Sequence, residues 1–201
     1  MGYLEATAVV YLRAAIDAGM VTPAQDPATF GTFEGLEVVR ELATLVMIAG
    51  VGWLAGRTRL ERLAWASVVF GLWDIVYYGG LRLAIGWPPT LDTWDVLFLV
   101  PIAWVGPIWA PIGVSGALVG VGLAAARRLN QGVAIDVRPG QAAAGIAGGG
   151  LVVASFLVDS GRVLAGDLSP WTGWPLYLAG LGLATAATLT AIVGVRRAGS
   201  P

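Results

Sequence analysis

Apolar residues gather in five long stretches of the chain, and each is close to the about 20 residues that a helix needs to cross a bilayer. The stretches hold few charged residues and do not alternate between apolar and polar positions as a half-buried strand would. Because a helix satisfies its own backbone hydrogen bonds, it is the expected form in lipid. The sequence predicts an all-α, polytopic membrane helix bundle with about five transmembrane helices, over residues 36–56, 63–86, 107–126, 140–158 and 171–195.

The N-terminal region holds no stretch of this length. Its apolar residues recur at helical spacing, with Glu5 and Arg13 on the other side. This pattern is typical of an amphipathic helix, which we expect on the outer leaflet or on the helix bundle. Residues 1–35 are therefore expected to form this helix and a loop on the outer face, and residues 36–197 a single transmembrane bundle.

The third apolar run, residues 96–126, is too long for one simple crossing, because a helix of about 31 residues would reach about 46 Å. Prolines interrupt its first half, and a proline inside a helix removes a hydrogen-bond donor and kinks the chain. We expect residues 107–126 to cross the membrane. Residues 96–106 are expected to form a short, proline-broken helix or a re-entrant piece at the outer boundary.

Charged residues in the loops predict how the chain is threaded. Arginines cluster after the first, third and fifth stretches, whereas acidic residues predominate on the opposite side. Since cytoplasmic loops are enriched in Lys and Arg, the arginine-rich loops are expected inside the cell. This alternation fits five spans with the N-terminus outside and the C-terminus inside.

The composition excludes several classes of protein. Of the 201 residues, 57% are hydrophobic and only 12% are charged, with a mean hydropathy of +0.75, whereas a soluble domain carries about 25% charged residues. The absence of Cys and His removes disulfides, thiolate or imidazole metal ligands and histidine general bases. The net charge of −1 gives no indication of a nucleic-acid partner.

Asp74 is the first candidate for chemistry, because it lies near the middle of the second span. A carboxylate in the membrane is costly, and such residues are functional candidates by default. Tyr78 and Arg82 follow at i+4 and i+8, so the three predict an intramembrane polar seam. Two interpretations stay open: a proton or substrate path that uses Asp74, or a structural pin that hydrogen-bonds to the third span.

Tryptophan is the second candidate, because six of the nine are expected on the outer side rather than in belts at both interfaces. They predict either an interfacial girdle or a docking surface for a partner, since Trp is favoured in interface anchors. The six residues are Trp87, Trp94, Trp104, Trp109, Trp171 and Trp174.

Glycine is abundant, with 29 residues, and small residues let helices approach closely in lipid. Three GxxxG pairs predict faces for helix packing, either within this chain or toward another subunit. The pairs are Gly52 with Gly56, Gly116 with Gly120, and Gly145 with Gly149.

About 40 residues in the middle of the chain carry an ordered set of aromatic, acidic and proline positions. The order is Trp73-Asp74-x-x-Tyr77-Tyr78, then Gly86-Trp87-Pro88, then Asp95-x-Leu97-Phe98-Leu99-x-Pro101 and Trp104-x-Gly106-Pro107. In this order the chain resembles an uncharacterised group of small bacterial multi-pass membrane proteins. The resemblance implies a bacterial cytoplasmic (inner) membrane, and it implies no activity, cofactor or catalytic residue.

These features favour a non-catalytic accessory or scaffold subunit of a larger bacterial membrane complex, such as an electron-transfer or photosynthetic one. Such a subunit would ligate no metal or cofactor directly, but it could contact lipid, quinone or pigment, and its partners would be the bilayer and other membrane subunits. The alternative is a small transporter or channel that uses Asp74 and the broken third run. An intramembrane enzyme is disfavoured, because no paired Asp or Ser–His arrangement is visible.

Overall fold

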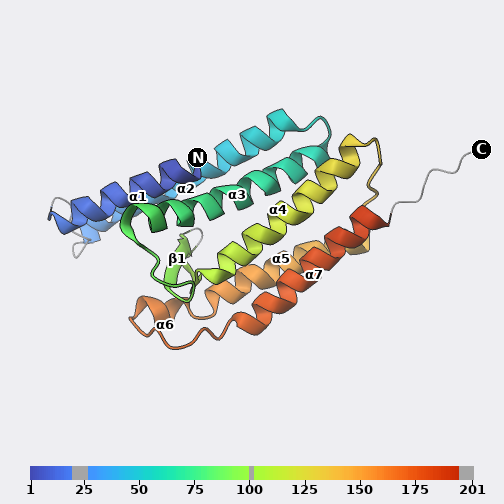
Figure 1. Cartoon of the computed structure of the whole chain (residues 1–201). Coiled ribbons are helices and arrows are strands. Elements are labelled where there is room, and N and C mark those ends of the chain that lie inside the picture. Colours follow the sequence, from blue (N-terminus) through green and yellow to red (C-terminus); the bar gives the residue numbers. More distant parts are fainter. Residues whose placement is uncertain (20–26, 100–101, 195–201) are drawn as a thin grey trace, which may run out of the picture.

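The computed structural model describes residues 1–19, 27–99 and 102–194, except for the side chains of residues 27–34 and 36. Most of the described chain is helical, with one small antiparallel sheet (Figure 1). The elements are α1 (Gly2–Asp17), α2 (Pro27–Ala55), α3 (Arg59–Ile85), β1 (Trp94–Phe98), β2 (Trp104–Pro107), α4 (Trp109–Asn130), α5 (Pro139–Leu157), α6 (Ser160–Leu164) and α7 (Trp174–Val193).

Five of the helices are long and apolar enough to cross a membrane, which confirms the predicted helix bundle. At most 28% of the residues in the apolar window of each candidate span are buried within the chain, so most of these residues keep some surface for contact with lipid. The spans are Glu37–Ala55, Arg59–Ile85, Trp109–Asn130, Pro139–Leu164 and Trp174–Val193.

Successive spans run in opposite directions, so the bundle has two distinct ends (Figure 1). One end carries the α2–α3 and α4–α5 loops (Figure 1). Arg57 lies in the first of these loops, Arg59 begins α3, and Arg127 and Arg128 lie in the last turn of α4, so we call it the arginine end. The other end carries the β-hairpin, α6 and the start of α7, and we call it the hairpin end.

Local sequence signals explain where α3 begins and ends. Its N-terminus has a capping box, in which the Thr58 side chain accepts from the Glu61 N–H at 3.2 Å and Glu61 accepts from the Thr58 N–H at 3.2 Å. Its C-terminus stops at Gly86, whose φ of +68° lies in the left-handed region that glycine adopts without strain.

The spans associate as two close pairs, α3 with α4 and α5 with α7. In the first pair, Gly71 lies directly against the backbone of Ser115. In the second pair, a Cβ added at Gly148 would lie 2.7 Å from the Gly180 carbonyl and 2.6 Å from the Ala184 nitrogen. Contacts between the two pairs are far sparser, and among the described residues they lie mainly between α4 and α7. Glycine therefore closes each pair internally and leaves space between the pairs.

Helices α1 and α2 cover α3 on its other side (Figure 1). Gly52 on α2 packs against Ala66 of α3, and Ala6 on α1 packs against Gly80 of α3. Of the two positions considered for the N-terminal helix, the structure shows the one on the bundle, with α1 along the half of α3 that leads to the hairpin end.

The expected short helix within residues 96–106 is wrong, because this segment forms the β1–β2 hairpin. Asp95 pairs with Gly106 and Val96 with Val105, and a register irregularity follows before Phe98. Prolines exclude a helix here, and the β-branched and aromatic residues between them favour strands.

The hairpin is tolerated within the bundle because its strands bond to each other and neighbouring helices satisfy groups near its tip. The Glu41 carboxylate of α2 accepts from the Leu99 N–H at 3.2 Å, and the Ser160 hydroxyl donates to the Ala103 carbonyl at 2.8 Å. Val105 of β2 is completely buried, so the hairpin is part of the core at this end.

The first of the predicted glycine pairs packs as expected. Gly52 and Gly56 lie against the start of α3, where a Cβ added at Gly52 would lie 2.8 Å from the Arg62 carbonyl. The close approach joins α2 to α3 near the arginine end. This pair is therefore a packing face within the chain.

The second pair, on α4, does not pack within the described chain, so of its two predicted roles only a face toward another subunit stays open. Gly120 is exposed, and a Cβ added there would meet no neighbouring atom of the described chain within 4 Å. Gly116 is exposed as well and is equally free of neighbours. The reason is the direction of the face, because α4 contacts α3 through Ser115 and Gly122, which lie on another side of the helix from Gly120.

The third pair, on α5, does not pack within the described chain either. A Cβ added at Gly145 or Gly149 would meet no neighbouring atom within 4 Å among the described residues. Gly148 contacts α7 instead, one position away from the predicted residue. Spacing alone therefore identified helices that carry small residues but not the side on which they pack.

Candidate functional site

An apolar cavity of about 330 Å³ lies between the α3–α4 pair and the α5–α7 pair. All four helices and both strands of the hairpin contribute to its walls. Its lining consists of Phe70, Trp73, Asp74, Leu97, Phe98, Trp104, Pro111, Val114, Ser115, Ala117, Leu118, Val121, Gly149, Val152, Val153, Phe156, Leu181, Ala184, Thr185 and Thr188.

Asp74 is the only charged side chain in the described wall of this cavity. It is 9% exposed, and one carboxylate oxygen accepts a 2.8 Å hydrogen bond from the Ser115 hydroxyl of α4. The close contact of Gly71 with the Ser115 backbone brings the two helices near enough for this bond. The second Asp74 oxygen has no hydrogen-bond partner among the described residues. The carboxylate thus retains the capacity to accept one further donor.

Two other polar groups of the wall also lack partners. The indole N–H groups of Trp73 and Trp104 are buried and have no acceptor in the described part of the chain. A buried donor without an acceptor costs about 1–3 kcal/mol, so most native structures avoid it. Both residues contribute to the wall of the cavity, but through the rest of their rings, because the two indole nitrogens are themselves fully buried.

A smaller pocket of about 60 Å³ lies next to the cavity, on the side of α1 and α2. It shares Trp73, Asp74, Leu97 and Phe98 with the cavity, but the remainder of its wall is mainly polar. We call it the acidic pocket. Its other lining residues are Glu5, Arg40, Glu41, Thr44, Leu45, Tyr77, Tyr78, Asp95 and Val96.

Acidic groups outnumber basic groups in this lining by four to one. The one arginine, Arg40, forms ion pairs with Glu5 of α1 and, at 2.7 Å, with Glu37 of α2. Within the described chain, Glu41, Asp74 and Asp95 have no basic side chain at ion-pair distance. The acidic pocket therefore carries an excess of acidic groups beside an apolar cavity.

Asp95 lies on β1, outside the spanning helices, and accepts a 3.0 Å hydrogen bond from the Tyr78 hydroxyl. Burial raises the pKa of Asp95 from its ordinary value of 3.8 to about 6. The bonds from Tyr78 and the Val96 N–H, together with the charge of Arg13, oppose this shift without cancelling it. The charge of Asp95 therefore changes near neutral pH.

The predicted seam of Asp74, Tyr78 and Arg82 is not a connected ladder. Asp74 bonds to Ser115 of α4, whereas Tyr78 bonds to Asp95 of the hairpin. Arg82 donates to the carbonyl oxygens of Gly86 and Pro88 at 2.7 and 2.8 Å, and so holds the loop after α3. The three side chains share a helix but act on three different partners.

The six tryptophans do not form one continuous exposed surface on the described chain. Trp171 is buried and stacks on Phe156, with 5.7 Å between ring centroids, while its indole donates to the Ser155 carbonyl at 3.2 Å. Trp94, Trp104 and Trp109 pack against the same core cluster, and Trp87 lies beneath the guanidinium of Arg13. Of the six, only Trp174 is exposed, at 52%.

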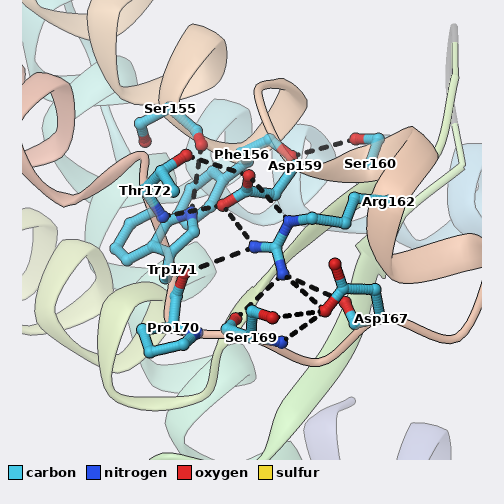
Figure 2. A network of polar contacts seen from close by, with 10 residues as sticks. All are labelled: Ser155, Phe156, Asp159, Ser160, Arg162, Asp167, Ser169, Pro170, Trp171 and Thr172. Atoms are coloured by element: carbon cyan, nitrogen blue, oxygen red, sulfur yellow. Dashed lines mark hydrogen bonds and ion pairs between the residues drawn. The ribbon is translucent and has the colours of Figure 1, made fainter.

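The hairpin end is held together by a polar network around Asp159 and Arg162 (Figure 2). The Asp159 carboxylate is buried and accepts from the Thr172 N–H at 2.7 Å and from the Thr172 hydroxyl at 2.9 Å. Arg162 pairs with Asp159 at 3.1 Å and with Asp167 at 3.3 Å, and it donates to the Ser169 carbonyl. The network fixes the loop between α6 and α7.

Several residues of the site were not found by sequence reasoning. Asp74 stood out because of its depth in an apolar span, but Glu5, Glu41 and Asp95 lie on three other elements. Glu5 interrupts the apolar part of α1, and Glu41 lies inside a predicted span. Both positions indicated that these carboxylates are buried. No local pattern indicates that these residues converge with Tyr77, because only the packing of α1, α2 and the hairpin on α3 brings them together.

No family model, no curated protein and no solved structure matches this chain. Among the described residues, no group of three or more acidic side chains is arranged to hold a metal ion. The functional argument therefore depends on the geometry of the cavity and the acidic pocket.

Proposed function

We propose that this chain is a non-catalytic accessory subunit of a larger bacterial membrane complex and that its cavity holds a lipophilic molecule. The observation that carries the proposal is the apolar cavity of about 330 Å³ between the two helix pairs. Small-molecule sites are concave, mostly apolar and about 300–1,000 Å³ in volume, with few polar groups that orient the ligand. A lipid, quinone or pigment has the apolar body that such walls favour.

The polar groups of the wall support binding rather than catalysis. Asp74 and Ser115 bond to each other, and the second Asp74 oxygen has no donor among the described residues. A hydroxyl or amine group on the bound molecule would supply that donor. An electron-transfer or photosynthetic complex is one setting in which molecules of this kind occur.

The exposed glycine pair of α4 supports the role as a subunit. Gly116 and Gly120 are both exposed, and a Cβ added at either position meets no atom of the described chain within 4 Å. Neither residue belongs to the wall of the cavity. In lipid, such a small-residue face allows another helix to approach closely, and a helix of a neighbouring subunit is the partner that it fits.

Detergent-free extraction in polymer-bounded lipid discs tests both parts of the proposal. Mass spectrometry should find other membrane proteins in fixed ratio to the chain and a lipophile enriched over the surrounding lipid. Ala117→Trp adds a large side chain to the cavity wall and should remove that lipophile. Ala147→Trp, on the exposed face of α5, is the matched control and should retain it. Absence of any enriched lipophile and of any partner would contradict the proposal.

A second candidate is a small transporter that uses Asp74, and one observation favours it. The cavity and the acidic pocket meet at Asp74, which gives this residue access to both. Purified chain in liposomes would then move a solute or protons in a manner that Asp74→Asn abolishes. Loss of such flux in the variant would favour the transporter over the accessory subunit.

A further inference from the structure

The cavity and the acidic pocket form one bipartite site, because Trp73, Asp74, Leu97 and Phe98 belong to the walls of both. We propose that this site binds an amphiphilic organic cation, with its apolar body in the cavity and its ammonium group between Asp74 and the acidic pocket. The inference rests on the proposed function, since it assigns a chemical class to the molecule that the cavity holds.

The charge of the acidic pocket selects a positive head group. Arg40 is engaged by Glu5 and Glu37, while Glu41, Asp74 and Asp95 have no basic partner within the described chain. Burying an ionised carboxylate is costly unless it is paired. An ammonium group supplies that pairing, whereas a phosphate or carboxylate head would be repelled by the same groups.

Asp74 provides the specific contact at the junction. Its side chain is about nine-tenths buried, one of its oxygens is held by Ser115, and the other has no donor among the described residues. A primary ammonium carries three N–H donors and can bond to this oxygen. Charge-assisted hydrogen bonds of this type are shorter and about twice as strong as neutral ones.

Aromatic rings complete the surroundings of the head group. Trp73 and Tyr77 are stacked with 6.3 Å between ring centroids, and Tyr78 lies edge-on to Tyr77 at 5.1 Å. All three rings contribute to the wall of the acidic pocket, and an ammonium near aromatic faces gains electrostatic stabilisation. The pocket volume of about 60 Å³ suits a small head group, and the cavity of about 330 Å³ suits an alkyl or ring body.

The test uses the full chain in phosphatidylcholine nanodiscs and two probes that differ only in the head, n-octylamine and octan-1-ol, with calorimetric titration against empty nanodiscs. The amine should bind saturably, at least about tenfold tighter than the alcohol, because each tenfold corresponds to about 1.4 kcal/mol. Asp74→Asn should weaken amine binding by at least about tenfold and leave alcohol binding unchanged. Asp92→Asn, an exposed acid outside both walls, is the matched control.

A second variant keeps the test decisive if Asp74→Asn does not fold. Asp95→Asn removes a charge from the acidic pocket alone and should also weaken the amine, by less than Asp74→Asn does. Equal affinity for amine and alcohol, or amine binding that neither variant changes, overturns the cation assignment. If Ala117→Trp then still blocks both probes, the lipophile-binding function stands without the cation. If neither probe binds and no lipophile co-purifies, the proposed function itself fails.

Discussion

Ser115 of α4 donates a 2.8 Å hydrogen bond to Asp74 of α3, although the two residues are 41 positions apart in the sequence. Gly71, one helical turn before Asp74, lies against the Ser115 backbone, so the helices are closest where their polar side chains meet. The same Asp74 lies in the wall of both the cavity and the acidic pocket. The contact therefore joins helix packing to the candidate binding site.

Ser115→Ala should destabilise the chain by about 1–3 kcal/mol, because it leaves the buried Asp74 carboxylate without its donor. The free energy of unfolding in detergent micelles, measured by titration with SDS, gives the change. Ser67→Ala is the control, since the Ser67 hydroxyl is exposed and donates to the Leu63 carbonyl of its own helix. Equal stability of the two variants would show that the Asp74–Ser115 bond does not hold the helix pair.

Two glycines of α5 should respond to alanine with opposite signs. At Gly148 the added Cβ would lie 2.6 Å from the Ala184 nitrogen, so Gly148→Ala should cost about 1–3 kcal/mol as α5 and α7 are pushed apart. At Gly150 it meets nothing within 4 Å, so Gly150→Ala should stabilise by about 0.5–1 kcal/mol through helix propensity. Thermal unfolding of both variants in one detergent makes the comparison. A stabilising effect at both positions would contradict the close α5–α7 contact.

Asp95 should make the chain less stable as pH rises. Its pKa is about 6 in the fold and near the ordinary 3.8 when unfolded, so between these values the folded state binds the proton and the unfolded state does not. The stabilisation is greatest below about pH 4 and is lost as pH rises through about 6. Asp95→Asn can still accept from Tyr78 but cannot ionise, so its unfolding free energy should vary less with pH.

Unfolding of the parent chain, Asp95→Asn and Asp92→Asn should therefore be compared across this pH range. Asp92→Asn is the control, because this exposed residue belongs to neither pocket wall and should keep the parent profile. Parallel profiles for Asp95→Asn and the parent would show that Asp95 is not the group that titrates.

The spans were predictable because lipid imposes a simple rule on composition. An apolar helix of about 20 residues is recognisable without knowledge of its neighbours, and the observed bounds of α4 and α7 differ from the predicted ones by only a few residues. Asp74 was identifiable for the same reason, since its carboxylate interrupts such a span. Local composition was therefore sufficient to predict both the fold class and the central residue of the candidate site.

Features that depend on contacts between distant segments were not predictable. The hairpin was missed because Val96 and Val105 pair across a segment that contains a proline, and the apolar length of the run masked its strand character. The GxxxG spacing did not identify the packing face of α4, since Gly122 meets α3 whereas Gly120 is exposed. Spacing along one helix does not specify which face a second helix will contact.

The loop between α6 and α7 should loosen when Asp159 is replaced. Asp159 accepts from the Thr172 N–H and hydroxyl and pairs with Arg162 (Figure 2). Asp159→Ala therefore leaves both Thr172 groups without this acceptor and removes one of the two ion pairs of Arg162. We expect a loss of about 2–4 kcal/mol, since hydrogen bonds to a charged group are worth about 1.5–3 kcal/mol each and the loop can relax in part. Hydrogen exchange should rise in residues 165–173 and stay unchanged in α3. Asp92→Ala is the control, and an unchanged exchange rate in that loop would contradict the role of Asp159.

The threading of the chain gives the last prediction. Thr90 lies at the hairpin end and Gln131 at the arginine end, and both are exposed. Because the sequence has no cysteine, Thr90→Cys and Gln131→Cys each carry a single thiol. With the arginine end inside, an impermeant maleimide should label Thr90→Cys in intact spheroplasts and label Gln131→Cys only after lysis. The reverse pattern would place the arginine end outside, and labelling of both in intact spheroplasts would contradict an odd number of crossings between these loops.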